Sequence, residues 1–434
     1  MATHAAGDWQ PGYLKRVVLA SLIGTTIEWY DFFLYGSAAA LIFNKLFFPE
    51  FDPWVGTLLA FATYALGFIA RPVGGVVFGH FGDRIGRKRL LMLSLILMGI
   101  ATTLIGVLPT YAQAGVAAPL ALILLRLVQG FAVGGEWGGA VLLVAEHGDA
   151  ARRGFWTSWP QAGVPAGNLL AAGVLAILAG TQSEADFLSW GWRIPFLLSA
   201  VLVAIGWWIR SSVAETRAFE QALAEQAPPR VPAVDVISEK PVELATGAGL
   251  RLGENVSYYI ITTFSITYMT TAGKLTKAEA LDTILIGAAL HFFAIPMLGR
   301  LSDRIGRRPV YAIGALGLAG FAFLFFGLIG SGSFVKAVAG IAIALLLHGA
   351  MYGPQAAFIT ELFPTRYRYS GASIAYQLTS IVAGSLAPII ATLLYGLHKD
   401  PLPVSLYVGA CCLVSGLTAL LARETRGIDL AAIR

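Results

Sequence analysis

Long apolar segments recur along this chain and limit what it can fold into. Each approaches the length of about 20 residues that a helix needs to cross a bilayer. In order, they span residues 17–43, 55–78, 90–108, 117–144, 156–179, 194–209, 252–271, 281–297, 310–329, 338–359, 373–397 and 406–421. Only 13% of the residues are charged, against about 25% in soluble domains. Because so apolar a surface cannot face water, we expect an all-α membrane protein with about twelve transmembrane helices.

The basic residues indicate how the chain crosses the membrane. The net charge of +5 could by itself suggest a nucleic-acid-binding protein, but Lys and Arg fall in alternate loops and form no single patch. The loops at 84–89, 152–153, 304–308 and 366–368 each hold several positive residues, and the loops between them hold few. Since positive loops stay in the cytoplasm, we expect a multi-pass protein of the inner (cytoplasmic) membrane with both termini cytoplasmic and no nucleic-acid partner.

Matching segments indicate a duplicated chain. Residues 79–89 read Gly-His-Phe-Gly-Asp-Arg-Ile-Gly-Arg-Lys-Arg, and residues 299–309 read Gly-Arg-Leu-Ser-Asp-Arg-Ile-Gly-Arg-Arg-Pro. At nearly the same offset, a second match pairs Glu146, Arg152 and Arg153 with Glu361, Arg366 and Arg368. We therefore predict two pseudo-symmetric six-helix bundles. A polar stretch with several prolines separates them, which gives an N-terminal bundle 1–210, a cytoplasmic linker 211–245 and a C-terminal bundle 246–434.

The same motifs resemble the major facilitator superfamily. The resemblance rests on the repeated Gly-x-x-x-Asp-Arg-x-Gly-Arg-Lys/Arg loop and on Arg126-x-x-Gln129-Gly130, and it covers the whole chain. Further segments are similar to the metabolite:proton symporter family, above all to its carriers of shikimate and other carboxylates: 24–36, 79–84, 134–139, 190–196 and 361–366. The resemblance implies proton-coupled symport of an organic acid or a betaine-type zwitterion by alternating access, with no cofactor.

Charged residues inside the apolar segments are the candidates for proton coupling. Glu28 and Asp31 lie one turn apart in the first segment, and Arg126 lies in the fourth. An ionised group at such a depth costs at least about 2.5 kcal/mol and marks an ion or substrate path. We expect Asp31 and Arg126 to meet near the membrane midplane, so that protonation of Asp31 leaves the guanidinium of Arg126 available to a substrate carboxylate. The alternative is a buried pair that only fixes helix packing.

Polar side chains along the helices are the candidates for substrate binding. They are Arg126, Gln129, Tyr35, Glu136, Gln161, Asn255, Tyr258, Tyr259, Tyr352 and Gln377. Hydroxyl, amide and guanidinium groups suit a hydroxylated or carboxylate solute, although polar residues also hold membrane helices together. We expect Arg251 to lie nearer the cytoplasmic mouth with its charge directed to water. His291 and His348 are more typical of packing than of a proton relay.

The repeated loop and the residues that echo it are the candidates for a gate. The set is Asp83, Arg84, Arg87, Glu146, Asp303, Arg304, Arg307, Glu361 and Arg366. Exposed ion pairs break at little cost, so that they could switch during transport. The alternative is that these charges only set the topology.

Other function classes lack their motifs in this sequence. There is no Gly-x-x-x-x-Gly-Lys-Ser/Thr loop for ATP, no Gly-x-Ser-x-Gly elbow and no His-Glu-x-x-His zinc motif. We therefore expect neither an ATP-driven pump nor an enzyme, and no metal. Saturable, proton-dependent accumulation would separate a symporter from a channel. Cys411 and Cys412 are adjacent in one helix and cannot bridge without strain.

The substrate has two open alternatives at this point. One is a small organic acid such as shikimate or 2-oxoglutarate, and the other is a zwitterionic osmolyte such as proline or betaine. Osmosensing carriers of the family have a long charged C-terminal extension, whereas this chain stops at Arg434 soon after its last helix. That difference favours an organic acid. The expected partners are therefore an organic anion, a proton and the lipid bilayer, with a monomer as the working unit.

Overall fold

The computed structural model describes residues 11–85, 87–211, 232–430 and 433, and every regular element in this part of the chain is a helix. The long helices of the N-terminal half are α1 (Pro11–Ala38) continued by η1 (Ala39–Phe43), α3 (Pro53–Ile85), α4 (Arg87–Val107), α6 (Ala117–His147), α7 (Arg153–Thr181) and α9 (Arg193–Ser211). Short elements between them are α2 (Asn44–Leu46), α5 (Tyr111–Ala114), η2 (Ala150–Arg152), α8 (Glu184–Asp186) and η3 (Phe187–Gly191).

The C-terminal half repeats this plan. Its long helices are α12 (Pro241–Tyr259) continued by η4 (Ile260–Phe264) and α13 (Ser265–Thr271), α14 (Lys277–Ile305), α15 (Arg307–Ile329), α16 (Phe334–Thr360), α17 (Arg368–Ser380) continued by η6 (Ile381–Ser385) and α18 (Leu386–His398), and α19 (Leu402–Leu421). Two short helices, α11 (Pro232–Glu239) and η5 (Thr365–Tyr367), complete the described part. Each apolar segment of the sequence coincides with one long helix or one continued helix. The domain boundaries stay a prediction.

Not every one of these helices is uniformly apolar. By length and hydropathy alone, 7 helices of the described part could each span a membrane, or 8 if the bent pair 184–191 and 193–209 is one span. Among the others, the α12 and α17 segments are interrupted by the π-helical turns η4 and η6, and α12 carries the polar residues Arg251, Glu254 and Asn255. π-helical turns within helices often occur at functional sites, and here they fall in the helices that carry the polar side chains.

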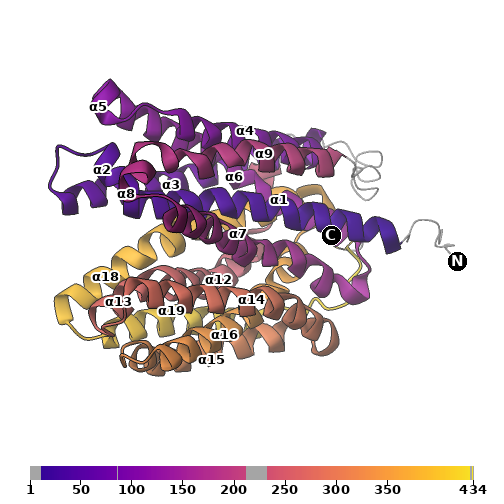
Figure 1. Cartoon of the computed structure of the whole chain (residues 1–434). Helices are drawn as coiled ribbons and strands as arrows, with labels where there is room; N and C mark the ends of the chain where they lie inside the picture. Colours follow the sequence, from indigo (N-terminus) through magenta and orange to yellow (C-terminus); the bar gives the residue numbers. More distant parts are fainter. Residues whose placement is uncertain (1–10, 86, 212–231, 431–432, 434) are drawn as a thin grey trace, which may run out of the picture.

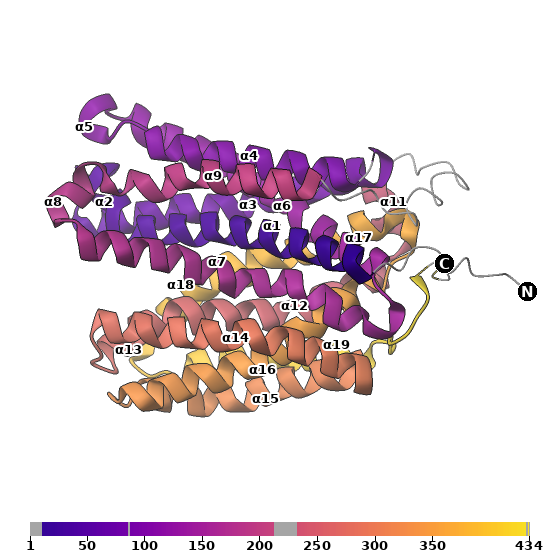
Figure 2. The same ribbon diagram turned by 45° about the vertical axis from the view of Figure 1, so that its right-hand side comes forward.

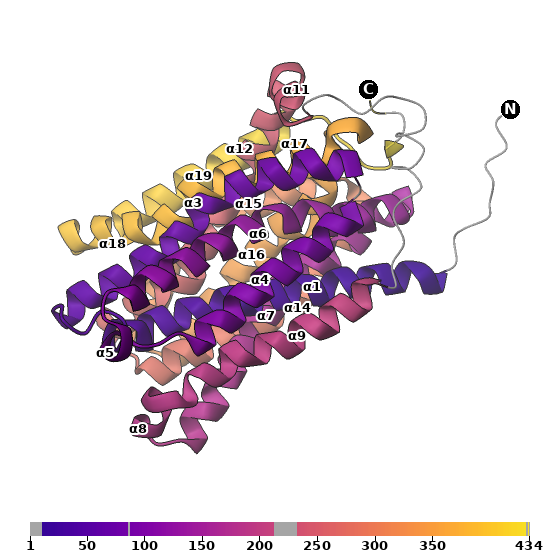
Figure 3. The same cartoon turned by 90° about the horizontal axis from the view of Figure 1, so that it is seen from above.

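The two halves pack in the same way. In the N-terminal half α1 packs on α7, α3 on α6, and α4 on both α6 and α9; in the C-terminal half α12 packs on α17, α14 on α16, and α15 on both α16 and α19. Figures 1 and 2 show the two groups on opposite sides of the molecule, with α7 between them. The halves meet along α7 with α14 and along α3 with α17, as the view from above also shows (Figure 3). These equivalent contacts confirm two pseudo-symmetric bundles.

The outer surface is apolar and the interior holds the polar groups. Large hydrophobic side chains such as Leu124, Trp208 and Leu397 are exposed, which is the arrangement that a lipid environment requires. Asp31, Arg126 and many other polar side chains are buried instead. Because an ionised group inside a membrane protein is costly and usually marks an ion or substrate path, the interior is where a functional site must be sought.

Glycines allow the helices around that interior to approach closely. A Cβ atom on Gly74 of α3 would lie 1.9 Å from the carbonyl oxygen of Phe131 of α6, and one on Gly130 of α6 would lie 2.0 Å from the carbonyl oxygen of Gly67. No side chain fits at such distances, so that only glycine permits this contact. Between the halves, a Cβ on Gly299 of α14 would lie 2.6 Å from the carbonyl oxygen of Gly154 of α7. The backbone contact of α3 with α6 places Arg71 and Arg126 close together.

Candidate functional site

Asp31 is the buried acid at the centre of the N-terminal half. Its side chain on α1 is 1% exposed. The hydroxyl of Ser199 on α9 donates to Oδ1 at 2.5 Å, and the hydroxyl of Thr102 on α4 donates to Oδ2 at 2.9 Å. Two neutral hydroxyl groups therefore satisfy this carboxylate. Neither of them brings a positive charge to balance it.

A chain of hydrogen bonds connects Asp31 with Arg126. Gln129 Nε2 donates to Thr102 Oγ1 at 2.7 Å, and Arg126 Nη1 donates to Gln129 Oε1 at 3.2 Å. Asp31 and Arg126, which we expected to meet, are joined through Thr102 and Gln129 and not by a direct hydrogen bond. Gln129 therefore connects the guanidinium of Arg126 with Thr102, the hydroxyl partner of Asp31.

Arg126 is enclosed by aromatic rings. The centre of its guanidinium lies 4.3 Å from the ring of Tyr35, 4.8 Å from that of Tyr64 and 5.3 Å from that of Phe32. Its remaining hydrogen bond goes to the backbone oxygen of Tyr64 at 3.4 Å, and Nε is buried without a partner. Cation–π contacts offset part of the cost of burying this charge. No carboxylate of the described residues pairs with it, so that it can accept one from outside.

Three other predicted residues of this half lie around the same helices. The Tyr35 hydroxyl forms a hydrogen bond of 2.7 Å with Thr63 of α3. Glu136, two turns after Gln129, accepts a hydrogen bond of 2.7 Å from Ser94 of α4, so that this contact lies on the side of α6 that packs on α4. Glu28 is buried on α1, one turn before Asp31. The structure brings Tyr35 next to Arg126.

The C-terminal half contains a second buried polar cluster, on α12, α14 and α16. Arg251 pairs with Glu254 one turn away and donates to Gln355 Oε1 at 3.3 Å. His348 Nε2 lies 3.0 Å from Glu254 Oε1, and His348 Nδ1 lies 3.1 Å from His291 Nε2. The expectation that Arg251 directs its charge to water at the mouth is wrong, because the side chain is buried and paired with a carboxylate. The two histidines form one hydrogen-bonded chain with Glu254.

Aromatic and amide side chains join the two halves between these clusters. The rings of Trp137 on α6 and Tyr376 on α17 stack at 3.8 Å, and the guanidinium of Arg251 lies 3.5 Å from the Tyr376 ring. Gln161 of α7 accepts a hydrogen bond of 2.6 Å from Trp137 Nε1 and donates to the backbone oxygen of Tyr352 at 3.4 Å. The predicted residue Gln161 therefore bridges the halves.

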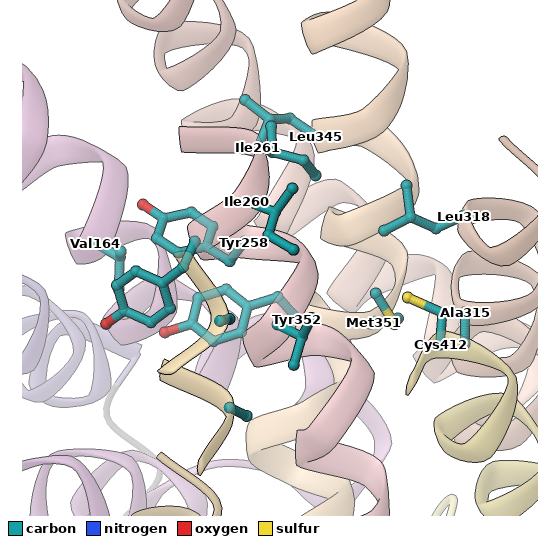
Figure 4. Close-up of a cluster of buried hydrophobic side chains, with 14 of the residues drawn as sticks. Val164, Tyr258, Ile260, Ile261, Ala315, Leu318, Leu345, Met351, Tyr352 and Cys412 are labelled. Atoms are coloured by element: carbon teal, nitrogen blue, oxygen red, sulfur yellow. The ribbon is translucent and has the colours of Figure 1, made fainter. Parts of the chain in front are cut away.

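The other predicted residues of the C-terminal half face the same boundary. Gln377 donates to the backbone oxygen of Gly134 in α6 at 3.2 Å. The ring of Tyr259 lies 5.7 Å from that of Phe68 in α3, and the hydroxyls of Tyr352 and Tyr376 are 3.5 Å apart. Figure 4 shows the hydroxyl groups of Tyr258 and Tyr352 directed to the side on which Val164 of α7 lies. Both tyrosines therefore face the N-terminal half.

Asn255 has an unsatisfied acceptor at this boundary. Its Oδ1 atom is buried and has no hydrogen-bond partner in the part of the chain that the structure describes. A Cβ atom on Gly384 of η6 would lie 2.9 Å from this oxygen and 3.0 Å from Cε1 of Phe68. Gly384 thus leaves room for Asn255 and Phe68 to approach each other from the two halves.

Several functional candidates were missed at the sequence level. Thr102 and Ser199 hold Asp31, yet hydroxyl residues in an apolar helix carry no distinctive sequence pattern. Arg71 is buried in α3 within the second apolar segment. Its position inside a span was a usable signal, by the same reasoning that identified Arg126.

At one end of the molecule Glu361 joins the two halves. It accepts hydrogen bonds from Arg153 Nη1 of α7 at 2.8 Å, from Arg307 of α15 at 3.3 Å and from Thr425 Oγ1 at 2.6 Å. The Arg153–Glu361 pair is 4% and 0% exposed. The expectation of exposed, easily broken pairs is therefore wrong for this contact, since a buried pair resists separation much more strongly.

Further predicted gate residues form contacts at the same end of the molecule as Glu361. Asp303 accepts from the backbone nitrogens of Gly154 and Phe155 at 2.8 Å each, and from Arg307 at 2.6 Å. These bonds attach the end of α14 to the start of α7. Glu146 pairs with Arg368 of α17 at 3.1 Å, which is a second ion pair between the halves. Figure 2 shows this end, marked by α11 and the start of α17, opposite α5 and α8.

Two gate candidates lie apart from this network. Arg366 pairs with Glu239 of α11 at 2.9 Å, and both side chains are about half exposed (48% and 49%). Arg304 is exposed and has no ion pair with any residue that the structure describes. The side chains of Asp83, Arg84 and Arg87 lie outside the described residues, so that their role stays a prediction. Among the residues described, no group of three or more His, Cys, Asp or Glu side chains could hold a metal ion.

Comparison with known proteins finds a matching family model, relatives of similar sequence and a solved structure of the same fold. A family model described as Major Facilitator Superfamily matches residues 21–388 and 252–428. The chain is 42% identical to the shikimate transporter of Escherichia coli (strain K12), over 95% of both chains. It is 34% identical to the proline/betaine transporter of Salmonella typhimurium, over 95% of this chain and 84% of that one. A solved structure of the proton:xylose symporter XylE superimposes with a TM-score of 0.81 at 16% identity, over 98% of this chain and 99% of that one.

Proposed function

Because the chain belongs to the major facilitator superfamily, we propose that it imports a small organic acid together with a proton by alternating access. It is a multi-pass membrane transporter and not an enzyme. Beyond the family, the proton, the class of solute and the direction of transport are supported by the buried charges, the polar side chains between the halves and the ion pairs at one end.

One observation carries the coupling of proton and solute. Asp31 is a buried carboxylate balanced only by hydroxyl groups, and Arg126 is a buried guanidinium without a carboxylate partner among the described residues. Thr102 and Gln129 connect them by hydrogen bonds. Each charge therefore stabilises the other at a distance. A change in the charge of either side chain therefore alters the free energy of the other.

Protonation of Asp31 then favours entry of an anion. A neutral Asp31 no longer needs the Thr102 hydroxyl proton, which can turn to its second acceptor, the backbone oxygen of Met98 at 3.0 Å. The distant negative charge that offsets Arg126 is lost at the same time. The guanidinium is left as an uncompensated cation with planar donors, which suits a carboxylate. Counted over Asp31, Arg126 and the solute, a proton and an anion together keep the net charge at zero, whereas either alone changes it by one.

A hydroxylated or keto carboxylic acid is the solute that fits best. Asn255, Tyr258, Tyr259, Tyr352 and Gln377 supply amide and hydroxyl groups at the boundary of the halves. The related transporters named above carry shikimate in one case and proline or betaine in the other, and each of these compounds has a carboxylate. The second candidate is a zwitterionic osmolyte, which the proline/betaine relative favours. The aromatic rings around Arg126 also suit a quaternary ammonium group.

The network at Glu361 supports a gate on one side of this path. Both ion pairs between the halves among the described residues, Arg153–Glu361 and Glu146–Arg368, lie at the same end. The positive loops of the sequence favour this end as the cytoplasmic one, with both termini there. The bonds then hold the cytoplasmic side closed while solute and proton enter from the other side. One chain contributes both halves and both buried polar clusters, so that a monomer suffices.

Uphill uptake by purified protein tests the proposal. Proteoliposomes with an alkaline interior are supplied with labelled shikimate, 2-oxoglutarate, proline or betaine. Saturable accumulation of a carboxylic acid above its external concentration, abolished by a protonophore, is the expected result. Accumulation of proline or betaine alone would establish the second candidate. Movement that stops at equal concentrations would show a channel or a uniporter and would contradict proton coupling.

A further inference from the structure

Arg71 is a buried cation that has no counter-ion among the residues that the structure describes. It lies on α3 and is 3% exposed. Its guanidinium contacts the faces of Phe68 at 4.5 Å, Phe32 at 4.6 Å and Trp29 at 5.9 Å. It forms no hydrogen bond or ion pair with any residue that the structure describes. Aromatic faces attract a cation, yet they offer no acceptor for its five N–H groups.

Comparison with the other buried arginines makes Arg71 unusual. Six arginines of the described residues are buried: Arg71, Arg126, Arg153, Arg251, Arg307 and Arg368. The last four each pair with a carboxylate within 3.3 Å. Only Arg71 and Arg126 have none. The fold thus supplies an internal acid for the arginines that hold helices together, and it leaves these two without one.

The two unpaired arginines lie beside each other. Both guanidinium groups approach the ring of Phe32, Arg71 at 4.6 Å and Arg126 at 5.3 Å. The glycine contact between α3 and α6 fixes their helices in place, since a Cβ on Gly134 would lie 2.1 Å from the backbone oxygen of Arg71. Two like charges at such a depth repel each other and are poorly solvated. An anion placed between them would relieve both costs.

We propose that Arg71 is the anchor for the carboxylate of the transported solute and that Arg126 is its second contact. The inference rests on the carboxylate substrate of the proposed function and assigns the binding of that group to a named side chain. The planar guanidinium can bind a carboxylate through two parallel hydrogen bonds, which fixes its orientation. On the side of the C-terminal half, the buried and unsatisfied Oδ1 of Asn255 then accepts a hydrogen bond from a hydroxyl group of the same solute.

The two arginines have different tasks in this arrangement. Arg126 is connected through Gln129 and Thr102 to Asp31, so that its charge depends on the proton. Arg71 has no such connection among the described contacts. Its removal should therefore weaken solute binding and leave proton coupling intact. Removal of an arginine that only held the structure together would not weaken solute binding selectively while proton coupling stayed intact.

The first test measures uptake by Arg71→Gln and Arg71→Lys in proteoliposomes, with the labelled acid that the wild type accumulates best. We expect KM to rise at least about 30-fold in Arg71→Gln, because truncating one partner of a buried charged contact is that costly. The KM of Arg71→Lys should lie between those of the wild type and Arg71→Gln, since lysine keeps the charge and loses the planar guanidinium. The accumulation ratio at saturating solute should stay at the wild-type value. Arg16→Gln, which removes an exposed arginine of α1, should leave KM unchanged.

The second test needs no transported solute. Thermal unfolding of the purified, solute-free protein in detergent is compared between wild type and Arg71→Gln. Removal of an uncompensated buried cation should leave the melting temperature unchanged or raise it, whereas removal of a packing residue should lower it. The carboxylic acids of the uptake panel should raise the wild-type melting temperature and fail to raise that of Arg71→Gln.

The outcomes separate this inference from the proposed function. A wild type that accumulates none of the acids contradicts the proposed function, and the thermal comparison still decides the role of Arg71. An unchanged KM in Arg71→Gln, or a melting temperature that falls in the absence of solute, would overturn the assignment of Arg71 as the carboxylate anchor. A loss of proton coupling in Arg71→Gln would also overturn it, because the two tasks would then not be separate.

Discussion

Substitution of Glu361 by Gln is the sharpest perturbation of the contact between the halves. Glu361 of α16 is shared by Arg153 of α7 and Arg307 of α15, and it is completely buried. Arg307 keeps a second carboxylate partner, Asp303, at 2.6 Å. Arg153 has no other ion pair among the described residues, and it retains only backbone acceptors such as Ile428 at 3.1 Å. The loss therefore falls mainly on the connection between the halves.

The expected magnitude follows from burial. Breaking a buried ion pair by removing one partner costs about 3–5 kcal/mol. At about 1.4 kcal/mol per tenfold change in an equilibrium constant, even 3 kcal/mol shifts the ratio of closed to separated forms by more than about 100-fold. The exposed pair Arg366–Glu239 at the same end is half exposed on both sides, and such pairs contribute about 0–1 kcal/mol. Arg366→Gln is thus a matched control that removes a charge at the same end.

A distance measurement between the halves tests this reasoning. Spin labels on cysteines at the exposed positions Arg152 and Arg304 report the separation of α7 from α14, after Cys411 and Cys412 are replaced by Ser. We expect a narrow distance distribution in the otherwise unchanged protein, and a dominant longer component in Glu361→Gln. Arg366→Gln should leave the distribution unchanged. A Glu361→Gln distribution that matches the control would refute the idea that the buried ion pair holds this end closed.

Two further predictions concern stability, read as thermal unfolding in detergent. Gly74→Ala should destabilise the protein by about 1–3 kcal/mol, because the new Cβ would lie 1.9 Å from the Phe131 carbonyl oxygen and force α3 and α6 apart. The control Gly173→Ala, at a position where nothing lies within 4 Å of the new Cβ, should leave the stability unchanged. Equal effects of the two substitutions would contradict the close contact of α3 and α6. Partial burial acts to raise the pKa of Glu424, but backbone N–H donors that include those of Arg307 and Arg308 hold the pKa below its usual 4.5. The stability that the Glu424 carboxylate adds, compared with Glu424→Gln, is therefore fully present above pH 4.5 and is lost as the pH falls through the lowered pKa of the folded protein. A stability difference between the two proteins that persists or grows on acidification would contradict this.

The arrangement of helices was accessible from sequence because its signals are local. A continuous apolar stretch predicts a span by itself, and all twelve stretches correspond to long or continued helices. The repeat of residues 79–89 at 299–309 likewise predicted two equivalent bundles, which the matching contacts of α3 with α6 and of α14 with α16 confirm. The π-helical turns η4 and η6 left no such trace in the sequence.

The site was less accessible because its contacts join distant parts of the chain. The sequence identified Asp31 and Arg126 as charges inside spans, but Thr102 and Gln129 between them depend on how α1, α4 and α6 pack. The partners of Glu361 were missed for the same reason. Arg153 is 208 residues away, and local spacing favoured residues on the same loop. Arg251 was misplaced because a charge near the start of a span resembles a residue at the membrane surface until Glu254 is seen beside it.

Accumulation driven only by a pH gradient tests the coupling of Asp31 to Arg126 most directly. Proteoliposomes are held at zero membrane potential with a one-unit pH gradient, which is worth about tenfold accumulation for each coupled proton. The wild type should concentrate its acid about tenfold or more, whereas Asp31→Asn should only equilibrate it and still exchange labelled for unlabelled acid. Accumulation by Asp31→Asn at the wild-type ratio would contradict the account.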